Sequence, residues 1–540
     1  WHPDSSDMRY MRIKGYERIA GAVYAEIAKA VREYRAKALY GKSQISLAPY
    51  AVWNTITKDQ AKKMSEDINP LNELKEMEAV TYVGVGGRAK EAMSASSRIY
   101  HPNDLGVISE GTVDSGDVAV NTFLSANPKL KNVRGLTEPV DAHELEGARI
   151  WSTIGMVSPG NLHDDPKRRL FAVVQHAHTV ACEGYHQPYV RTGYEYVIPY
   201  RVGKLYAYMA QDDGEVIERS EHAIVVRYQN GEEVGVQLGR HYGRAEGSIY
   251  PHDIKSPLNL HDRFKKGDPI AYHSGFFEPD VLNPKQIILK TSLNAKVVFM
   301  DSTQTIEDAS SISKRLSQKL RTHVIKELSY LVRFNQNVRK VLPQGTEVSP
   351  NDVLFIIEDE ITSNLELFDE DTIESLARLA QYAPRAKVKG VIDRYEVYYN
   401  GELEDMSASL RKLASDSDKA LRERTRYSDF PVQSGRVNEE YRVDGTPLDV
   451  DTAVIKVYIE VSDEARVGDK GVFANQMKSI FSEVMGYEVK TESGVEIDAI
   501  FSFKSINNRI VMSPLLIGTT TTLLEVIAKK AIALYEGVGA

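Results

Sequence analysis

The sequence is poor in cysteine, in long apolar runs and in excess positive charge, and each absence excludes a class of protein. Its single cysteine, Cys182, excludes an intrachain disulfide framework or a cysteine-rich zinc module built by this chain alone, and it favours a reducing compartment. No apolar run reaches the ~18 residues of a membrane-spanning helix, so we expect no membrane partner. With 67 basic and 76 acidic residues the net charge is −9, which argues against a histone-like protein but not against nucleic acid bound in a local basic channel.

What the chain does have is length and an ordinary globular composition. Its 540 residues are 42% apolar and 26% charged, which excludes wholesale disorder and collagen-like or coiled-coil architectures. At about 150 residues per domain, the length predicts three or four domains.

Local patterns predict a mixture of helices and many short strands. Apolar residues on one helical face predict helices over 10–40 and 520–535. Residues 311–333 are also predicted to be helical, and residues 404–425 are predicted to form a charged helix with few apolar positions. Short alternating bursts between Gly and Asp turns predict a β-rich region over 185–300. The patterns also predict short strands around a helix near 372–382 within 341–400, and a strand over 451–461.

Single motifs do not select a function. The glycine-rich stretch Val83–Gly87 is not followed by Gly-Lys-Ser/Thr, so it is not a P-loop. His176 and His178 could be two metal ligands on one side of a strand, or two structural imidazoles. The pair Glu307–Asp308 could bind Mg²⁺ or orient a phosphate, or could be a surface feature at the start of a helix.

Five separated segments carry more information together than any one of them does alone. They are Asn69-Pro-Leu with the glycine-rich stretch to Gly116, His163–Arg168, Phe299-Met with Ile306–Ser313, Gly468-Asp-Lys470 with Lys478, and Ile497–Ile500 with Arg509. In order and spacing they resemble the second largest (β) subunit of cellular multisubunit RNA polymerases. The resemblance covers about 60–510.

The extent of the resemblance implies the carboxy-terminal half of a split β chain, as in the RNA polymerases of giant bacteriophages. The expected protein partners are an amino-terminal-half β-like subunit, β′-like subunits that carry an Asp triad, and a promoter-specificity factor. DNA template, RNA transcript and nucleoside triphosphates are the expected ligands. The expected location is the host cytoplasm during infection or the virion.

The resemblance also assigns roles to individual residues. Arg168 and Arg509 would hold the incoming triphosphate, since guanidinium grips phosphate oxygens bidentately. Lys470 and Lys478 would lie by the RNA 3′ end and the α-phosphate as point charges. Two Mg²⁺ ions serve such a phosphoryl transfer, held mainly by the partner β′-like chain; this chain has no Asp-x-Asp-x-Asp, so it should be inert alone. The remaining residues implied are Glu307 and Asp308 near the second Mg²⁺, and Asn69, Lys90, His176 and His178 near the fork or the RNA–DNA hybrid.

The implied fold is a multidomain, β-rich α+β chain with a double-psi β-barrel of the β-subunit type. Residues 1–150 would be the fork and rifampicin-pocket-like region with an amino-terminal helix, and residues 151–330 the first part of the barrel and the hybrid-binding region. Residues 331–450 would be an inserted flap-like domain, and residues 451–540 the second part of the barrel and a carboxy-terminal helix.

Departures from the family pattern lead to two further expectations. Glu76, Ala79 and Thr81 stand where the family has His, Arg and Ser, which predicts a rifampicin-resistant enzyme. Ser115 replaces a family Glu, with Asp114 beside it, which predicts altered strand-separation contacts at the fork.

Two alternative functions remain open at this point. One is a catalytically inert, polymerase-like structural or virion protein; the lysines and Arg509 in register with the family weigh against it. The other is a general nucleic-acid-binding protein, against which the lack of a dense basic patch with interleaved aromatics weighs.

Overall fold

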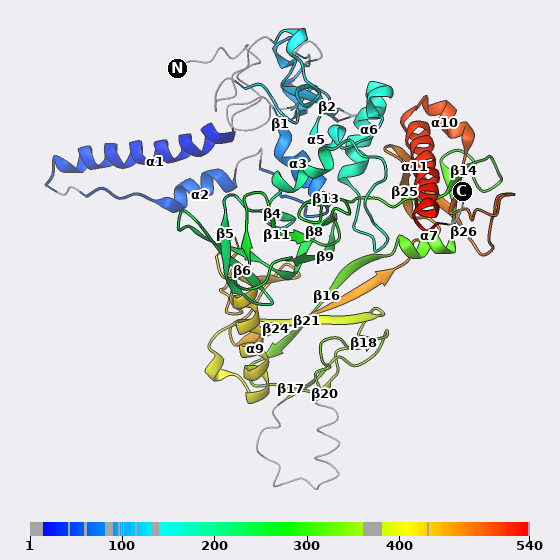
Figure 1. Ribbon diagram of the computed structural model, residues 1–540. Coiled ribbons are helices and arrows are strands. Elements are labelled where there is room, and N and C mark those ends of the chain that lie inside the picture. Colours follow the sequence, from blue (N-terminus) through cyan, green and yellow to red (C-terminus); the bar gives the residue numbers. More distant parts are fainter. Residues whose placement is uncertain are drawn as a thin grey trace, which may run out of the picture.

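A computed structural model of the protein describes residues 15–41, 44–58, 62–81, 90–94, 98, 100, 102–113, 116–130, 140–359, 381–428 and 431–537. Strands dominate these ranges, and helices lie mainly in the first third and at the carboxyl end (Figure 1). The chain is thus a multidomain, β-rich α+β protein. None of its described helices combines the length and the apolar character needed to cross a membrane.

The amino-terminal region is mainly helical. Its helices are α1 (Gly15–Ala38), α2 (Pro49–Thr57), α3 (Pro70–Glu78), α4 (Gly147–Ile150), α5 (Thr153–Met156) and α6 (Pro166–Ala177). A small sheet of order β1-β3-β2 packs beside them, made of β1 (Ala79–Thr81), β2 (Ile108–Thr112) and β3 (Asn121–Leu124). Both α3 and α6 begin with an Asn or Asp cap followed by proline, a common start of a helix, because proline needs no hydrogen-bond acceptor there.

The middle of the chain forms the predicted β-rich region. One sheet has the order β10-β5-β6-β7, with β5 (Gly214–Arg219), β6 (Ala223–Tyr228), β7 (Glu233–Gln237) and β10 (Arg263–Phe264). Two further strands, β12 (Phe277–Pro279) and β13 (Ile287–Leu289), pair with each other.

A second, larger sheet contains strands from the β-rich middle of the chain and strands from the region that is drawn lowest in Figure 1. Its order is β18-β21-β24-β16-β9-β11-β4, with β8 on β9. The strands are β4 (Ala207–Met209), β8 (Gly239–Ala245), β9 (Ser248–Lys255), β11 (Pro269–His273), β16 (Thr322–Arg333), β18 (Glu347–Val348), β21 (Gly390–Asn400) and β24 (Thr452–Asp463). β16 and β24 are paired over their whole length, from Thr322 opposite Asp463 to Arg333 opposite Thr452.

The lower region is inserted between β16 and β24. It contains β17 (Asn337–Arg339), β19 (Ile356–Glu358), β20 (Gln381–Tyr382), α9 (Ala408–Thr425), β22 (Arg442–Val443) and β23 (Thr446–Pro447). Helix α9 starts at the cap Ser407 and buries Leu410, Ala414 and Leu421, which lie on one face. The core of this region is formed by Leu410 and Ala414 with apolar side chains of β21 and β24.

The region at the right of Figure 1 combines segments from two distant parts of the chain. Its sheet has the order β14-β27-β15-β26-β25, and we call it the site sheet. Its strands are β14 (Val297–Phe299), β15 (Ala309–Ser313), β25 (Lys470–Phe473), β26 (Met477–Met485) and β27 (Ala499–Phe501). The helices around it are α7 (Lys314–Lys319), α10 (Phe503–Arg509) and α11 (Ser513–Tyr535). The site sheet is open within the described residues.

Most predicted elements are confirmed. Helices α1, α9 and α11 and strand β24 lie where helices over 10–40, 404–425 and 520–535 and a strand over 451–461 were predicted. The helix predicted over 311–333 is wrong: β15 ends at Ser313, the short α7 follows, and β16 occupies Thr322–Arg333. Pairing with β24 outweighs the helical pattern there. Of the helix predicted near 372–382, residues 372–380 lie outside the described residues, and Gln381–Tyr382 form β20.

Candidate functional site

The site sheet brings together motifs that lie almost 200 residues apart. β14 runs parallel to β27, with Val297 opposite Ala499, and β15 runs parallel to β26, with Ala309 opposite Ile480. β15 also pairs antiparallel with β27. The segments that carry Glu307 and Asp308, the two lysines and Arg509 therefore belong to one sheet and its adjoining turns.

Lys470 and Lys478 lie on the same exposed face of the hairpin β25–β26. Lys470 is opposite Ile480, and Val472 is opposite Lys478, so the two lysines are diagonal cross-strand neighbours, a relation that places Cα atoms roughly 7–8 Å apart. The alternate residues of both strands point inward: a side chain at Gly471 would collide with the ring of Phe481. Within the described chain, neither lysine forms an ion pair, so both ammonium groups face solvent.

Arg509 ends helix α10 and reaches across to the same hairpin. Its Nη2 donates a hydrogen bond to the carbonyl oxygen of Lys478 at 3.1 Å and forms an ion pair with Asp308. The Arg509 side chain is only 11% exposed, and its Nη1 is buried with no hydrogen-bond partner among the described residues. A buried donor without a partner costs about 1–3 kcal/mol, so an oxygen that accepted a hydrogen bond from Nη1 would remove this cost.

The turn at Glu307–Asp308 is fixed by its backbone. Glu307 has φ of 56°, and its carbonyl accepts a hydrogen bond from the hydroxyl of Ser505 in α10. The carbonyl of Asp308 accepts from the hydroxyl of Ser479 at 2.8 Å and from the N–H of Ile480 at 3.1 Å. Both carboxylates therefore project from a positioned turn, and that of Asp308 is 65% exposed in spite of its pair with Arg509.

Arg168 is not in contact with these residues. It lies near the start of α6, half-buried, with its guanidinium carbon 5.4 Å from the centre of the Phe171 ring. The loop before α6 is nevertheless joined to the site, because the carboxylate of Asp164 accepts from the N–H of Met512 at 2.8 Å and from that of Ser513 at 2.9 Å. These bonds join the loop before α6 to the residues that follow α10, and no contact between Arg168 and Arg509 is found among the described residues.

A second bond of the same loop fixes it to the hairpin turn. The amide of Asn475, between β25 and β26, donates to the carbonyl of Pro159 at 2.6 Å. Gly160 follows with φ of 71°, and a Cβ there would lie 3.2 Å from Cα of Ser513, so this close approach favours glycine. Sequence reasoning missed Asp164 and Asn475; for Asp164 the signal was its place just before a capped, proline-started helix.

The side chains of Asn69 and His176 form hydrogen bonds within the fold. Asn69 is fully buried; its side chain caps α3 by accepting from Asn72 N–H at 2.8 Å and donates to the carbonyl of Ala177 at 2.7 Å. Nδ1 of His176 hydrogen bonds to the carbonyl of Ala172 at 2.8 Å, within α6. The pair His176 and His178 therefore lies at a helix end and not on a strand, the setting in which the two rings could have been metal ligands.

His178 is the member of this group that reaches toward the site. It is exposed at the carboxyl end of α6. Partial burial lowers the pKa of His178, and the positive charges of Lys75 and Lys478 lower that pKa further. Lys478 is thus within electrostatic range of this imidazole.

The remaining predicted residues are described only in part or not at all. Lys90 begins the short 3₁₀ turn Lys90–Ala92, and only its backbone is described. Val83–Gly87, Asp114 and Ser115 lie outside the described residues. No group of three or more His, Cys, Asp or Glu side chains suited to a metal ion is found in the described ranges.

Comparisons with known proteins agree with the resemblance at a coarse level. The family described as "Bacteriophage RNA polymerase" matches residues 1–91. The chain is also similar to the DNA-directed RNA polymerase subunit beta of two strains of Thermus thermophilus, at 21% identity over 573 aligned positions in each case. That alignment covers 91% of this chain and 48% of each relative, so the chain spans about half the length of these relatives. The matches support an RNA polymerase β-like protein related to a multisubunit enzyme.

Proposed function

We propose that this chain is the carboxy-terminal half of a split β-like subunit of a phage multisubunit DNA-dependent RNA polymerase. One observation carries the proposal. Arg509 contacts both Lys478 and Asp308, and Lys470 lies on the same exposed face as Lys478. Each of these residues comes from a motif that resembles the β family, and the fold joins the motifs at one place.

The proposed reaction is nucleotidyl transfer to RNA. The 3′ hydroxyl attacks the α-phosphate of a nucleoside triphosphate, and pyrophosphate leaves as negative charge develops on the phosphates. The ammonium groups of Lys470 and Lys478, which have no acidic partner among the described residues, would stabilise this charge. Arg509 would offer its unpartnered Nη1 to a phosphate oxygen. Arg168 would join the triphosphate only after its side chain leaves Phe171.

The acidic residues fit a peripheral role toward Mg²⁺. Glu307 and Asp308 are exposed, but Asp308 is engaged by Arg509, and two carboxylates do not make a cage for a metal ion. Such a pair fits a site in which the partner β′-like chain holds the ions through its Asp triad. Mg²⁺ bound there would neutralise charge on the triphosphate.

The finer assignments of the fold belong to the same proposal. The parallel pairs β14–β27 and β15–β26 support the view that the site sheet is this chain's share of a double-psi β-barrel. The region inserted between β16 and β24 would be the flap, which docks a promoter-specificity factor. His178 and Lys90 would lie near the RNA–DNA hybrid. The enzyme would act in the host cytoplasm or be carried in the virion.

Reconstitution tests this function. The chain is combined with an amino-terminal-half β-like chain and with the chains that carry Asp-x-Asp-x-Asp, and extension of a primed RNA is measured with Mg²⁺. We expect extension only when this chain is present. A stable complex that never extends RNA would identify the inert structural alternative, and an active complex without this chain would contradict the proposal. The same assay with rifampicin tests the expected resistance.

A further inference from the structure

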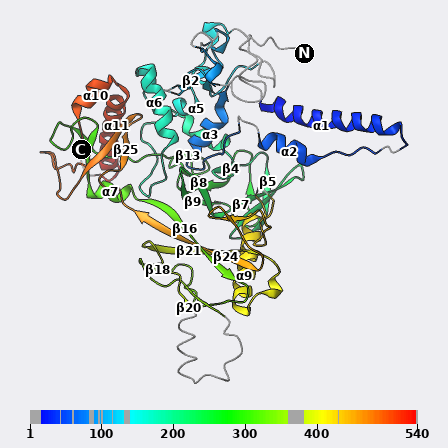
Figure 2. The same ribbon diagram turned by 180° about the vertical axis from the view of Figure 1, so that it is seen from behind.

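Helices α1 and α2 form an arm that leaves the rest of the molecule. In two opposite views α1 extends away from the sheets, with α2 beneath it (Figures 1 and 2). The two helices contact each other, and the N–H of Ala48, the residue before α2, donates to the carboxylate of Glu26 in α1 at 3.2 Å. We call residues 15–41 and 44–58 the arm.

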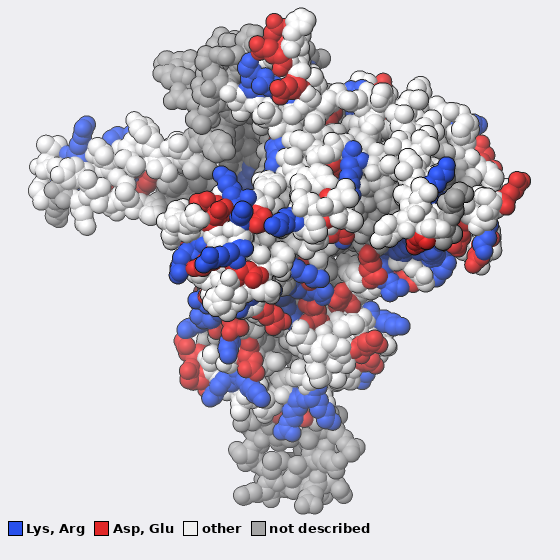
Figure 3. Space-filling view, viewed as in Figure 1, with Lys and Arg blue, Asp and Glu red and all other residues white. Residues whose placement is uncertain are grey.

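The arm carries an uncovered apolar stripe. Ile19, Val23, Ile27 and Val31 follow one another at every fourth position of α1 and are 51%, 42%, 46% and 37% exposed. Tyr24 and Tyr34 flank the stripe and are exposed as well. On the face of the arm seen in Figure 3, uncharged side chains cover most of the surface, with a few charged side chains among them. Such spacing is typical of a helix face that packs against protein.

The arm has almost no core of its own. Among the side chains of the arm that the structure describes, Ala30 is the one buried apolar side chain, and α2 has no buried side chain. In α2, Tyr50 and Trp53 are 71% and 62% exposed. Because isolated helices gain most of their stability from packing, two helices with one buried alanine need another surface to stay ordered. A contiguous apolar patch of this kind marks an interaction site.

We propose that this stripe binds an apolar groove on the polypeptide that supplies the remaining half of the β-like scaffold, by helix-on-helix packing. The inference rests on the proposed function. The arm lies within residues 1–91, the part that matches the phage polymerase family, so the exposed stripe belongs to the polymerase-like portion of the chain. The chain spans 48% of its β relatives, and under the proposed function the other half of the scaffold is a separate polypeptide.

The charged side chains of the arm indicate which charge the rim of that groove should carry. Toward the end of α1, Lys29, Arg32, Arg35 and Lys37 are exposed, and Glu33 is the one exposed carboxylate described among them. The groove should therefore have an acidic rim around an apolar floor. The four residues of the stripe itself are aliphatic and offer no surface for base stacking, so the stripe fits a protein better than a nucleic acid.

Binding between full-length chains tests the inference. This chain and the amino-terminal-half β-like chain encoded with it are purified, and their dissociation constant is measured. The variant Val23→Asp/Ile27→Asp is expected to bind at least about 100-fold more weakly, because two carboxylates replace side chains that enter an apolar groove. The matched control is Ala25→Asp/Ala36→Asp, which adds the same charge to exposed positions away from the stripe and should bind within threefold of the wild type.

Further measurements separate the possible occupants. Both variants should melt within about 2 °C of the wild type, because all four positions are exposed. A photo-crosslinker at position 27 should capture the partner chain, and one at position 36 should not. Normal binding by the stripe variant overturns the inference and leaves the proposed function standing. Self-association of the wild-type chain through the stripe, or loss of nucleic-acid binding alone, also overturns it. Two wild-type chains that form no complex and no active enzyme overturn both proposals.

Discussion

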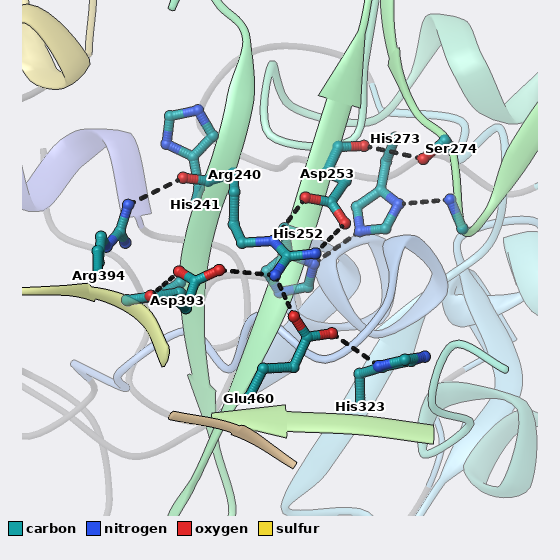
Figure 4. Close-up of polar contacts among 12 residues, drawn as sticks. Arg240, His241, His252, Asp253, His273, Ser274, His323, Asp393, Arg394 and Glu460 are labelled. Atoms are coloured by element: carbon teal, nitrogen blue, oxygen red, sulfur yellow. Dashed lines mark hydrogen bonds and ion pairs between the residues drawn. The ribbon is translucent and has the colours of Figure 1, made fainter. Parts of the chain in front are cut away.

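Two groups of positively charged side chains in this molecule differ in how fully they are paired with carboxylates. On β8, the guanidinium of Arg240 bonds both carboxylate oxygens of Asp253, at 2.8 and 2.9 Å, and also Asp393 at 2.8 Å and Glu460 (Figure 4). Glu460 in turn lies 2.7 Å from Nδ1 of His323. Each of these charged groups is paired within the fold, and together the pairs connect β8, β9, β21, β24 and β16.

In the region of the site sheet, the positive charges of the proposed site residues are not fully paired with carboxylates. Lys470 and Lys478 have no acidic partner among the described residues, and Arg509 has one carboxylate and a buried nitrogen without an acceptor. A cation that is fully paired stabilises the structure and has nothing left for a ligand. A cation that is held in place but unpaired contributes little to folding and is available for a phosphate. The comparison predicts that mutations in the two groups will affect different measurements.

The largest expected effect is on catalysis by the lysines. Lys470→Ala and Lys478→Ala should each slow extension of a primed RNA by about 10²–10³-fold, because a positioned charge at a transferring phosphate contributes several kcal/mol to the transition state. Assembly and melting temperature should not change, since both side chains are exposed and unpaired. Lys490→Ala is the control, because Lys490 is equally exposed but paired with Glu488. Near-normal extension by either variant would contradict the role.

The next effect is on stability and comes from Arg240. Arg240→Met leaves three carboxylates without their common partner, so the free energy of unfolding should fall by about 3 kcal/mol in urea titrations. Extension by the folded complex should be unchanged. Arg227→Met is the matched control: its pair with Glu233 is about half exposed on both sides, so the loss should stay under about 1 kcal/mol. If the free energy of unfolding fell equally in the two variants, the Arg240 network would be no more stabilising than the exposed pair of Arg227 and Glu233.

Elements with strong local patterns could be predicted from the sequence, and elements fixed by distant pairing could not. Helix α9 and strand β24 follow from their own apolar spacing. β16 does not, because its residues also fit a helical pattern and its state is decided by β24, more than a hundred residues later. In such cases local preference yields to tertiary context.

The site could be predicted only in part, for a similar reason. The spacing of Lys470 and Lys478 fits a short hairpin, but the contact of Arg509 with Asp308 depends on how β15 and β26 pair. Asn69 was expected near the fork or the RNA–DNA hybrid, and in the structure its side chain forms hydrogen bonds at the ends of two helices. A sequence motif does not indicate which of its polar side chains will form hydrogen bonds within the fold.

A third prediction concerns two buried histidines near Arg240. Nδ1 of His273 accepts from Gly275 N–H at 2.9 Å, so its other nitrogen donates to Nδ1 of His252 at 2.9 Å. His252 in turn donates to the carbonyl of Asp67 at 2.7 Å. Both rings are therefore neutral, and burial lowers the pKa of each, that of His252 to about 4.

Because the folded pKa lies below the ordinary value near 6.5, the unfolded chain takes up protons first on acidification. The free energy of unfolding should fall between pH 6.5 and about 4, by about 1.4 kcal/mol per pH unit for each histidine. His252→Gln should reduce this slope in urea titrations, while His143→Gln, at an exposed position, should leave it unchanged. A wild-type stability that does not vary over this range would contradict the neutral pair.

The smallest effect has the opposite sign and comes from His323, within the Arg240 network. Its ring lies between Glu460 and Glu183, at 2.7 and 2.8 Å, and these bonds, the one to Glu460 first, raise the pKa of His323. Its contribution to stability is therefore complete below pH 6.5 and is lost as the pH rises through the raised value. The same bond lowers the pKa of Glu460 to about 2, so the contribution of Glu460 is present above its ordinary value of 4.5 and is lost only as the pH falls toward 2.

The bridge should thus be at full strength between about pH 4.5 and 6.5. His323→Gln should lower the free energy of unfolding by about 1 kcal/mol at pH 6 and by clearly less at pH 8.5. Glu183→Gln should act in the same direction but more weakly, because Glu183 is 50% exposed. A loss that is equal at both pH values would mean that His323 acts by packing alone. In that case the Arg240 network would join its strands without the histidine charge, and the contrast with the unpaired lysines would rest on Arg240 and its carboxylates.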